Sequence, residues 1–192
     1  WTAGEHAVFR FRKVSIKGRK FRPFSVASAP EEGVILLGTR TGTTPSAYKN
    51  HLLHLKKGSP VIIHGPFGWF KIRDDDTPIV LFAAGVGITP IRALLVSLAQ
   101  DTNRPIEIIY SSESQFLFEK EIEAIVASNS SMTLHKVRSV SQTHEQLAQT
   151  AQKYGNCCYY YISGAPGIIK SVRALYKENG IKRRRMINDP FY

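Results

Sequence analysis

The sequence predicts a two-domain α+β protein in which an antiparallel β domain precedes a doubly wound α/β domain with a parallel sheet. Polar and apolar residues alternate from residue 6 onward, which is the period of a half-buried strand. After residue 77, short apolar runs alternate with segments of helical length, as in a parallel sheet covered by helices on both faces. A polar linker at residues 74–76 separates the two patterns. We therefore expect domains at residues 1–74 and 77–192.

The first domain is expected to consist of strands joined by glycine-containing turns, with one helix. Gly18 marks a hairpin turn, and the helix is expected to open at Thr44 or Pro45 and to end before Gly58. The expected strands lie at residues 6–12, 21–30, 34–40 and, together with the turn that follows it, 59–72.

In the second domain, each apolar run of strand length is followed by a helical segment. The last helix is expected to begin at Gly167 and to end at Gly180, a residue type typical of helix C-termini. The strands are expected at residues 79–82, 106–110, 132–137 and 157–162 and in the tail 183–192, and the other helices from residue 90, at 116–127 and at 144–154.

Net charge and the two cysteines limit the classes of function. The formal net charge is +11, with basic clusters at residues 10–22 and 182–185, so anionic partners are expected to be attracted. Zinc-finger spacing and an RNA-binding aromatic signature are absent, which disfavours a nucleic-acid partner. Cys157 and Cys158 are adjacent, which fits neither a disulfide framework nor metal-ligand spacing. We expect a buried, reduced pair and no metal site.

The turn at residues 85–90 is the most informative stretch of the chain. An apolar strand leads into Gly85 and Gly87, and an apolar helix follows, with Thr89 as the expected N-cap and Pro90 at the first helical position. Glycines before a helix start let a phosphate approach the free amides and the positive end of the helix dipole. This turn is therefore a candidate pyrophosphate site. The same pattern also occurs in α/β domains that bind no nucleotide, and Pro90 stands where a full dinucleotide fingerprint has a third glycine.

Four motifs together resemble the ferredoxin–NADP reductase superfamily. GVGITPIRALL at residues 85–95 is similar to its NAD(P)H pyrophosphate motif, and RPFS at 22–25 is similar to its flavin motif. GPFGWF at 65–70 and SGAP at 163–166 occupy the places of its barrel-closing turn and of its nicotinamide motif. The resemblance implies an oxidoreductase that binds FAD and either NADH or NADPH. It also implies that the first domain is an antiparallel flavin-binding β-barrel that is incomplete at its N-terminal end.

The resemblance assigns roles to residues of the flavin domain. Arg22 would neutralise the FAD pyrophosphate, Phe24 would pack on the isoalloxazine or the ribityl chain, and Ser25 would bond the flavin ring near its reactive nitrogen. The helix start after Gly42 departs from the family's spacing. The expected flavin-binding residues are Arg22, Pro23, Phe24, Ser25, Thr43, Thr44, Ser46, Gly65, Gly68 and, in the tail, Phe191.

The resemblance also assigns the nicotinamide side. Ser163 replaces the cysteine that the family places beside the nicotinamide carbon, and a serine is a less polarizable neighbour for the hydride. Ser25 and Ser163 are thus the expected catalytic positions, and Asp189 stands where glutamate is more common in the family. The expected nucleotide-binding residues are Gly85, Gly87, Ile88, Thr89, Pro90, Ser111, Ser112, Gly164, Ala165 and Pro166.

Several alternatives remain open at this level. Serines at 111 and 112 favour the extra phosphate of NADPH, whereas Glu113 favours the free ribose of NADH. The electron acceptor is expected to be a separate protein, a quinone, a metal chelate or a membrane haem. The similarity of RPFS to the HPF motif of ferric reductases implies a cytoplasmic domain attached to an upstream membrane portion. The rival hypothesis is a non-catalytic nucleotide-binding or regulatory module of the same fold.

Overall fold

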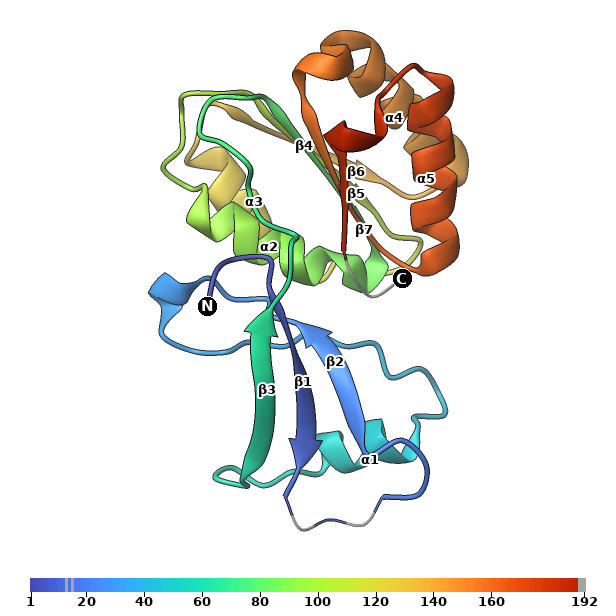
Figure 1. Ribbon diagram of the computed structural model, residues 1–192. Coiled ribbons are helices and arrows are strands. Elements are labelled where there is room, and N and C mark those ends of the chain that lie inside the picture. The colour runs from blue at the N-terminus through green and yellow to red at the C-terminus, as the bar shows by residue number, and fades with distance from the viewer. Residues whose placement is uncertain (13, 15, 190–192) are drawn as a thin grey trace.

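The computed structural model describes residues 1–12, 14 and 16–189, and these form two sheets stacked one above the other (Figure 1). The lower sheet is antiparallel and the upper sheet is parallel, as the sequence predicts. Helix α2 (Ile88–Ser97) lies between them, directly above the antiparallel strands. The predicted domain limits at residues 74 and 77 lie between the last antiparallel strand and the first parallel one.

The antiparallel sheet has three strands in the order β2-β1-β3 and is open. Its members are β1 (His6–Phe11), β2 (Phe21–Ser25) and β3 (Val61–Phe67). Helix α1 (Ala47–Leu53) covers one face through Tyr48, whose ring stacks on Phe11 at 4.6 Å and whose hydroxyl donates to the Phe9 carbonyl at 3.0 Å. The apolar face of β1 that the alternating pattern predicts is thus the face that packs against α1.

The strand predicted at residues 34–40 is wrong. This segment makes a single bridge, between Val26 and Leu37. The Ser28 hydroxyl accepts from the Leu36 amide at 2.9 Å and donates to the Val34 carbonyl at 2.5 Å. A side chain that bonds the backbone in this way takes the partners of a strand ladder, so the segment remains irregular.

The parallel sheet has the strand order β6-β5-β4-β7-β8. After β4, the chain adds β5 and β6 on one side of β4 and then β7 and β8 on the other side. This reversal places a topological switch point between β4 and β7, where ligands bind in sheets of this kind. The five strands are β4 (Ile79–Ala84), β5 (Ile106–Ser111), β6 (Met132–Val137), β7 (Tyr159–Ser163) and β8 (Met186–Asn188).

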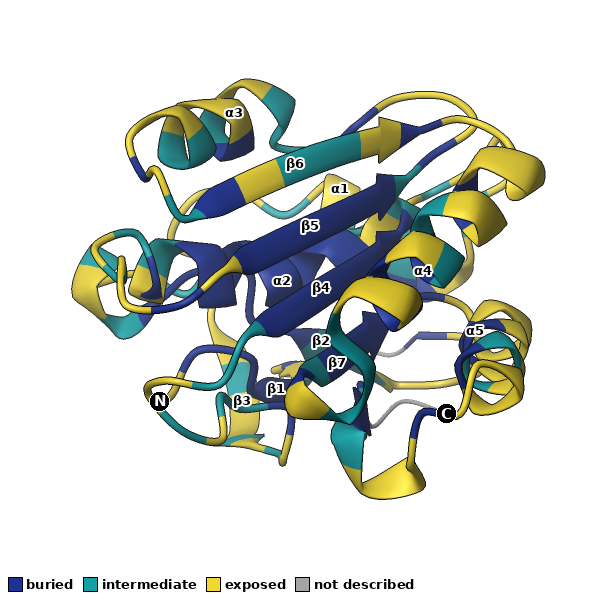
Figure 2. Ribbon diagram, turned by 90° about the horizontal axis from the view of Figure 1, so that it is seen from above, coloured by how far each residue is buried: buried dark blue, intermediate teal, exposed yellow. Residues whose placement is uncertain are grey.

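Helices cover both faces of the parallel sheet, so the doubly wound prediction is confirmed. Helices α2 and α3 (Glu119–Ala127) pack on the face that Leu81 joins, and α4 (Val140–Tyr154) and α5 (Pro166–Glu178) pack on the face that Phe82 joins. Figure 2 shows β4 and β5 in the colour of buried residues along their length. Such strands read as continuous apolar runs rather than as alternating patterns.

Two local predictions have different outcomes. The last helix ends as expected, because Gly180 follows its C-cap with a φ of +79° and its amide donates to Lys177. The prediction of a buried cysteine pair is wrong for Cys157, which is exposed in the short 3-10 turn before β7, while Cys158 is buried. Burial raises the pKa of the Cys158 thiol. Only one of the two thiols is therefore open to reagents.

Candidate functional site

The glycine turn after β4 and the end of β7 are in direct contact. A Cβ atom built on Gly87 would lie 2.6 Å from both the carbonyl carbon and the oxygen of Ser163, and 2.7 Å from the amide of Gly164. Only glycine allows this approach of two backbones. The fold thus brings together the two motifs that the sequence places at the pyrophosphate and at the nicotinamide.

The prediction that Thr89 caps the helix is wrong. A 3-10 turn, Gly85–Gly87, runs directly into α2, so Gly87 is the N-cap and Thr89 lies inside the helix. The Thr89 hydroxyl donates to the Val86 carbonyl at 3.0 Å instead of accepting from an amide. Pro90 accordingly takes the third helical position rather than the first.

The accessible part of this turn consists of Gly85 and Val86. Ile88, Thr89 and Pro90 are buried, whereas Gly85 is partly exposed and Val86 is exposed. Gly85 has a φ of +54° and no other group within 4 Å of its Cβ direction. The open space beside Gly85 and the positive end of the α2 dipole suit a phosphate group.

One carboxylate joins the two predicted catalytic serines. Ser25, at the end of β2, donates to Oδ2 of Asp189 at 3.2 Å, and Ser163, at the end of β7, donates to the same oxygen at 3.1 Å. Asp189 follows β8 and is held by its own amide, which donates to the Ile162 carbonyl at 3.0 Å. The bridge connects the antiparallel sheet to the parallel sheet beside the switch point.

Asp189 is a buried carboxyl group with a perturbed acidity. Its residue is 4% exposed, and burial raises its pKa to about 6, an effect that the two serine hydroxyls partly offset. No cation pairs with it among the described residues. A carboxyl group that changes its charge near neutral pH between two site motifs is a candidate functional group. Sequence reasoning identified Asp189 only as part of the acidic tail.

The RPFS and GPFGWF motifs flank the start of β1, one on each side. His6 pairs with Ser25 on one side and with Phe67 on the other, and its ring meets the Phe67 ring edge-on at 4.7 Å. Gly68 has a φ of +137°, and a Cβ atom there would lie 2.9 Å from the His6 ring. Gly65 is equally close to the Phe67 ring. The two predicted flavin motifs are therefore separated by a single strand, β1.

Arg22 and Phe24 project from the same face of β2, toward α1. The Arg22 guanidinium lies 5.6 Å from the centre of the Tyr48 ring, and Phe24 packs edge-on against Phe9 at 5.8 Å. No carboxylate pairs with Arg22 within the described part of the chain. The cation is thus available for an anionic ligand, while Phe24 contributes to the packing under α1. Pro23 lies between them, half-buried.

The segment leading into α1 is exposed. Thr43 and Thr44 are exposed, and the helix begins at Ala47 rather than at the predicted Thr44 or Pro45. Ser46 is the N-cap, and its hydroxyl accepts from the Lys49 amide at 3.4 Å. The side chain of Ser46 therefore already has a structural use.

Ser111 and Ser112 lie at the same sheet edge as the glycine turn, since Ser111 pairs with Ala84 across β4 and β5. Ser111 shares a hydrogen bond of 3.1 Å with Thr143, and Ser112 donates to the Gln115 carbonyl at 2.8 Å. Both hydroxyls therefore have partners within the protein. These contacts do not distinguish between NADH and NADPH.

The other predicted residues follow β7 or lie in the tail. Ala165 and Pro166 are exposed at the start of α5, for which Ala165 is the N-cap. Gly164 is buried, and Ser163 before it is fully buried. Phe191 lies outside the described residues.

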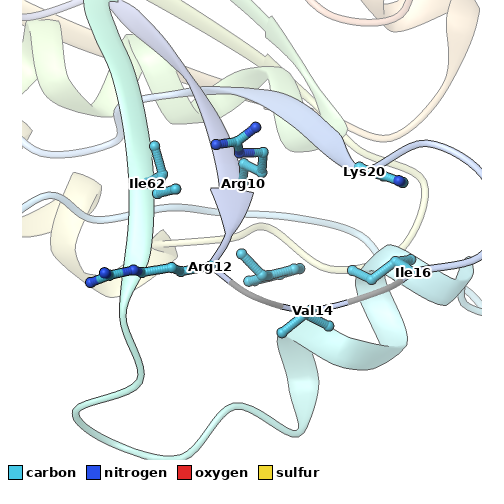
Figure 3. A pocket seen from close by; sticks show the side chains of 7 residues that line it. Arg10, Arg12, Val14, Ile16, Lys20 and Ile62 are labelled. Carbon is cyan, nitrogen blue, oxygen red and sulfur yellow. The ribbon is translucent and has the colours of Figure 1, made fainter.

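A separate basic cavity of about 540 Å³ lies at the far end of the antiparallel sheet, below the stacked domains (Figure 3). No residue predicted to bind a cofactor lines it, and all of its charged lining groups are cationic. Among the described residues, no group of three His, Cys, Asp or Glu side chains is arranged to hold a metal ion. The lining residues are Arg10, Phe11, Arg12, Val14, Ile16, Lys20 and Ile62.

The comparisons with known proteins agree with this geometry. Residues 81–174, which include the glycine turn and the SGAP segment, match the family model described as the oxidoreductase NAD-binding domain. The ferredoxin–NADP reductase of Plasmodium falciparum superposes with a TM-score of 0.70 over 98% of this chain and 82% of that one, at 17% identity. Residues 81–174 thus form an oxidoreductase NAD-binding domain. The whole chain has the two-domain fold of the ferredoxin–NADP reductase.

Two further proteins to which the chain is similar have names that describe redox functions. The FAD/NAD-binding domain of a nitric oxide dioxygenase from Vibrio cholerae superposes with a TM-score of 0.75 over 98% of this chain and 84% of that one, at 20% identity. A component of the Na⁺-translocating NADH-quinone reductase of Yersinia pseudotuberculosis is 26% identical over 96% of this chain. The chain spans about half of that relative, 52% of its length. None of the described helices combines the length and the hydrophobicity that crossing a membrane requires.

Proposed function

We propose that this chain transfers electrons from NADH or NADPH through FAD to a separate acceptor. The observation that carries the proposal is the Asp189 bridge, in which one carboxylate oxygen accepts from Ser25 of the flavin motif and from Ser163 of the nicotinamide motif. A nucleotide at the glycine turn and a flavin at RPFS would meet at this bridge. Bound FAD would supply the chemistry, because its ring accepts hydride and releases electrons one or two at a time.

The residues present fit both cofactors. For FAD, the chain offers a guanidinium without a carboxylate partner among the described residues at Arg22 and a serine at the end of β2. For the nucleotide, the turn offers open space at Gly85, where a side chain would fill the place of a phosphate. The rest of the proposed binding set falls into two groups. On the flavin side it comprises Thr43, Thr44, Ser46, Gly65 and Gly68. On the nucleotide side it comprises Ile88, Thr89, Pro90, Ser111, Ser112 and residues 164–166.

Asp189, Ser25 and Ser163 would position protons and rings during the reaction. As a carboxylate, Asp189 holds both hydroxyls through their protons, so the lone pairs of the serine oxygens are directed away from it. It would also keep a negative charge between the two cofactor positions, where it would stabilise the positive charge of an oxidised nicotinamide. The chain thus contributes orientation and electrostatics.

We propose that the electron acceptor is itself anionic or that it docks on this chain through an anionic surface of its own. The basic cavity supports this, because its charged lining groups, Arg10, Arg12 and Lys20, are all cations. The Yersinia relative belongs to a Na⁺-translocating NADH-quinone reductase, which supports a quinone or a redox protein as acceptor and a position at the cytoplasmic face of a membrane. A metal chelate or a membrane haem would serve the same chemistry.

One observation favours a second candidate function, a nucleotide-binding module without electron transfer. Ser163 is fully buried and its hydroxyl is held by Asp189, so the side chain does not reach into open space beside the nicotinamide position. Such a module would bind NADH or NADPH at the glycine turn, and added FAD would change nothing.

Substitution of Arg22 separates the two candidates. Arg22→Ala is expected to weaken FAD binding by about tenfold, because a hydrogen-bonded cation opposite a phosphate contributes about 1.5 kcal/mol or more. The control is Arg184→Ala, which removes an equal charge from an exposed site in the basic tail cluster. Equal FAD affinity in both variants, measured by flavin fluorescence, would contradict the assignment of RPFS.

A further inference from the structure

The structure assigns a positioning role to Arg92, a residue that no cofactor motif uses: it locks the nucleotide domain onto the flavin domain. This inference rests on the proposed function, because the consequence of the lock is a fixed distance between nicotinamide and flavin. Arg92 belongs to α2, three residues after Thr89, and its residue is only 4% exposed. A buried guanidinium is destabilising unless every donor is paired, so its partners define its role.

All five N–H groups of Arg92 donate hydrogen bonds. Nη1 donates to the Ala27 carbonyl at 2.7 Å and to Glu32 Oε2 at 2.9 Å, and Nη2 donates to Glu32 Oε1 at 2.7 Å. Nε donates to Glu121 Oε2 at 3.0 Å, and the remaining Nη2 proton goes to Glu121 Oε1. Ala27 and Glu32 belong to the flavin domain and Glu121 to α3 of the nucleotide domain. We call these four residues the Arg92 cluster.

The Glu32 carboxylate of the cluster is held in place by hydrogen bonding within the flavin domain itself. Glu32 ends the 3-10 turn Pro30–Glu32, and its Oε2 also accepts from the Ala29 amide at 2.7 Å. The Arg92 hydrogen bonds lower the pKa of Glu32, so the carboxylate stays charged. A planar guanidinium that binds a fixed carboxylate in a bidentate manner restricts rotation as well as distance.

The cluster lies next to both cofactor motifs in the chain. Ala27 is two residues beyond Ser25, and Arg92 is seven beyond Gly85. A second contact supports the same interface, because a Cβ atom on Gly38 would lie 2.5 Å from Cγ2 of Thr89. The Asp189 bridge and the hydrogen bond that the Tyr161 hydroxyl donates to the Lys71 carbonyl at 3.1 Å also join the domains. The Arg92 cluster adds a buried, charged contact that restricts rotation of one domain against the other.

Loss of the cluster should therefore act on the step that needs both domains. Hydride transfer requires the reacting atoms to be about 3–3.5 Å apart, and a misplacement of 1 Å reduces such rates by about a hundredfold. A step that needs only the flavin domain, such as oxidation of reduced flavin by ferricyanide, should not change. Binding of each cofactor to its own domain should change little.

The test compares Arg92→Met and Arg92→Lys with Arg184→Met, which removes an exposed arginine. Spin labels on the exposed Cys157 and on Lys57→Cys report the distance between the domains without any cofactor. We expect a narrow distance distribution in the parent and control proteins and a broad one in Arg92→Met, with Arg92→Lys between them. Unchanged distributions in all variants would overturn the positioning role.

The kinetic part uses the same variants with FAD bound. Flavin reduction by NADH or NADPH is expected to fall about 10- to 100-fold in Arg92→Met, with ferricyanide oxidation within about twofold of the parent. Equal losses in both steps would contradict positioning and indicate a general loss of structure. If the parent protein is not reduced by either nucleotide, the proposed function fails, while the distance measurement still decides the role of Arg92.

Two glutamate substitutions provide an alternative test if Arg92→Met does not fold. Glu32→Gln removes the charged partner across the interface, whereas Glu121→Gln removes the partner in the same domain. Only Glu32→Gln should broaden the distance distribution and slow flavin reduction. Equal behaviour of the two variants would overturn the assignment.

Discussion

The hydroxyls of Ser25 and Ser163 donate to the same oxygen, Oδ2 of Asp189, at 3.2 and 3.1 Å, although the two serines belong to different sheets. Motifs that lie far apart in the chain thus share one acceptor at the switch point of the parallel sheet. The arrangement places a charged group where a flavin and a nicotinamide would meet, and it can be tested residue by residue.

Replacing Asp189 by Asn tests the bridge. An Asn side chain keeps an oxygen that can accept from both serines but carries no negative charge, so the substitution removes the charge of the bridge. We expect flavin reduction by NADH or NADPH in Asp189→Asn to fall about tenfold or more, as when one group that stabilises developing charge is removed. Stopped-flow absorbance measures the rate, with the exposed Asp75→Asn as control. Equal rates in the two variants would show that the bridge is only structural.

The raised pKa of Asp189 predicts how stability depends on pH. Its pKa is about 6 in the folded protein and 3.8 when exposed, so its stabilising effect is complete below about pH 3.8 and is lost as pH rises through 6. This difference of about two pH units corresponds to roughly 3 kcal/mol. Relative to Asp189→Asn, the parent protein should therefore lose stability by up to that amount between pH 4 and pH 8. The free energy of unfolding in urea is measured against pH for both proteins. The same pH dependence in both would contradict the raised pKa of Asp189.

Gly85 and Gly87 should respond differently to alanine. Gly85→Ala places a methyl group in open space at a φ of +54°, which costs about 1 kcal/mol but obstructs the phosphate position. Gly87→Ala forces the Ser163 backbone away and should cost about 1–3 kcal/mol as well as nucleotide affinity. Calorimetry of NADH and NADPH binding, alongside thermal unfolding, distinguishes the two effects.

The control for the glycine turn is Gly180→Ala, which has the same kind of strain at a φ of +79° and open space, but lies at the end of α5. It should reduce stability as Gly85→Ala does and leave nucleotide affinity unchanged. If Gly85→Ala binds nucleotide as tightly as Gly180→Ala, the turn is not the pyrophosphate site.

A second buried carboxylate, Glu107, has the opposite pH dependence. Its oxygens accept from His135 at 2.8 Å, Lys153 at 2.6 Å and Tyr154 at 3.0 Å, and these hydrogen bonds, that of His135 above all, lower its pKa to about 2. Its stabilising effect is present above about pH 4.5 and is lost as pH falls through 2.

Glu107→Gln should therefore destabilise the protein by about 1–3 kcal/mol at pH 7 and by little near pH 2. The matched control is Glu123→Gln, since Glu123 pairs with Lys136 on the surface, where such pairs contribute about 0–1 kcal/mol. Urea unfolding at both pH values measures the difference. A loss at pH 7 no larger than that of the control would contradict the role of Glu107.

Much of the fold could be predicted from the sequence because buried parallel strands are continuous apolar runs. The strands predicted at residues 79–82 and 106–110 correspond to the buried strands β4 and β5, which extend slightly further. The strand expected at 34–40 begins with equally apolar residues, but the Ser28 hydroxyl takes its backbone partners. Ser28 lies outside residues 34–40, so the pattern of polar and apolar residues within that segment does not indicate the competition.

Site prediction reached the motif residues but missed the contacts between domains. The predicted Thr89 cap is wrong because the backbone turn Gly85–Gly87 starts the helix earlier without a side-chain cap. Asp189 and Arg92 bind partners that are distant in sequence. One signal was available: Arg92 stands among the apolar residues of α2, where a charged side chain must find buried partners.

The central proposal is that this chain passes electrons from a nicotinamide to a bound flavin. The most direct test is a visible absorption spectrum of the protein with added FAD, followed by anaerobic titration with NADH and, separately, NADPH. We expect a bound-flavin band that one or both nucleotides bleach, and the more effective nucleotide would settle the cofactor preference. A flavin band that neither nucleotide bleaches, or no bound flavin at all, would contradict the proposal and favour the non-catalytic module.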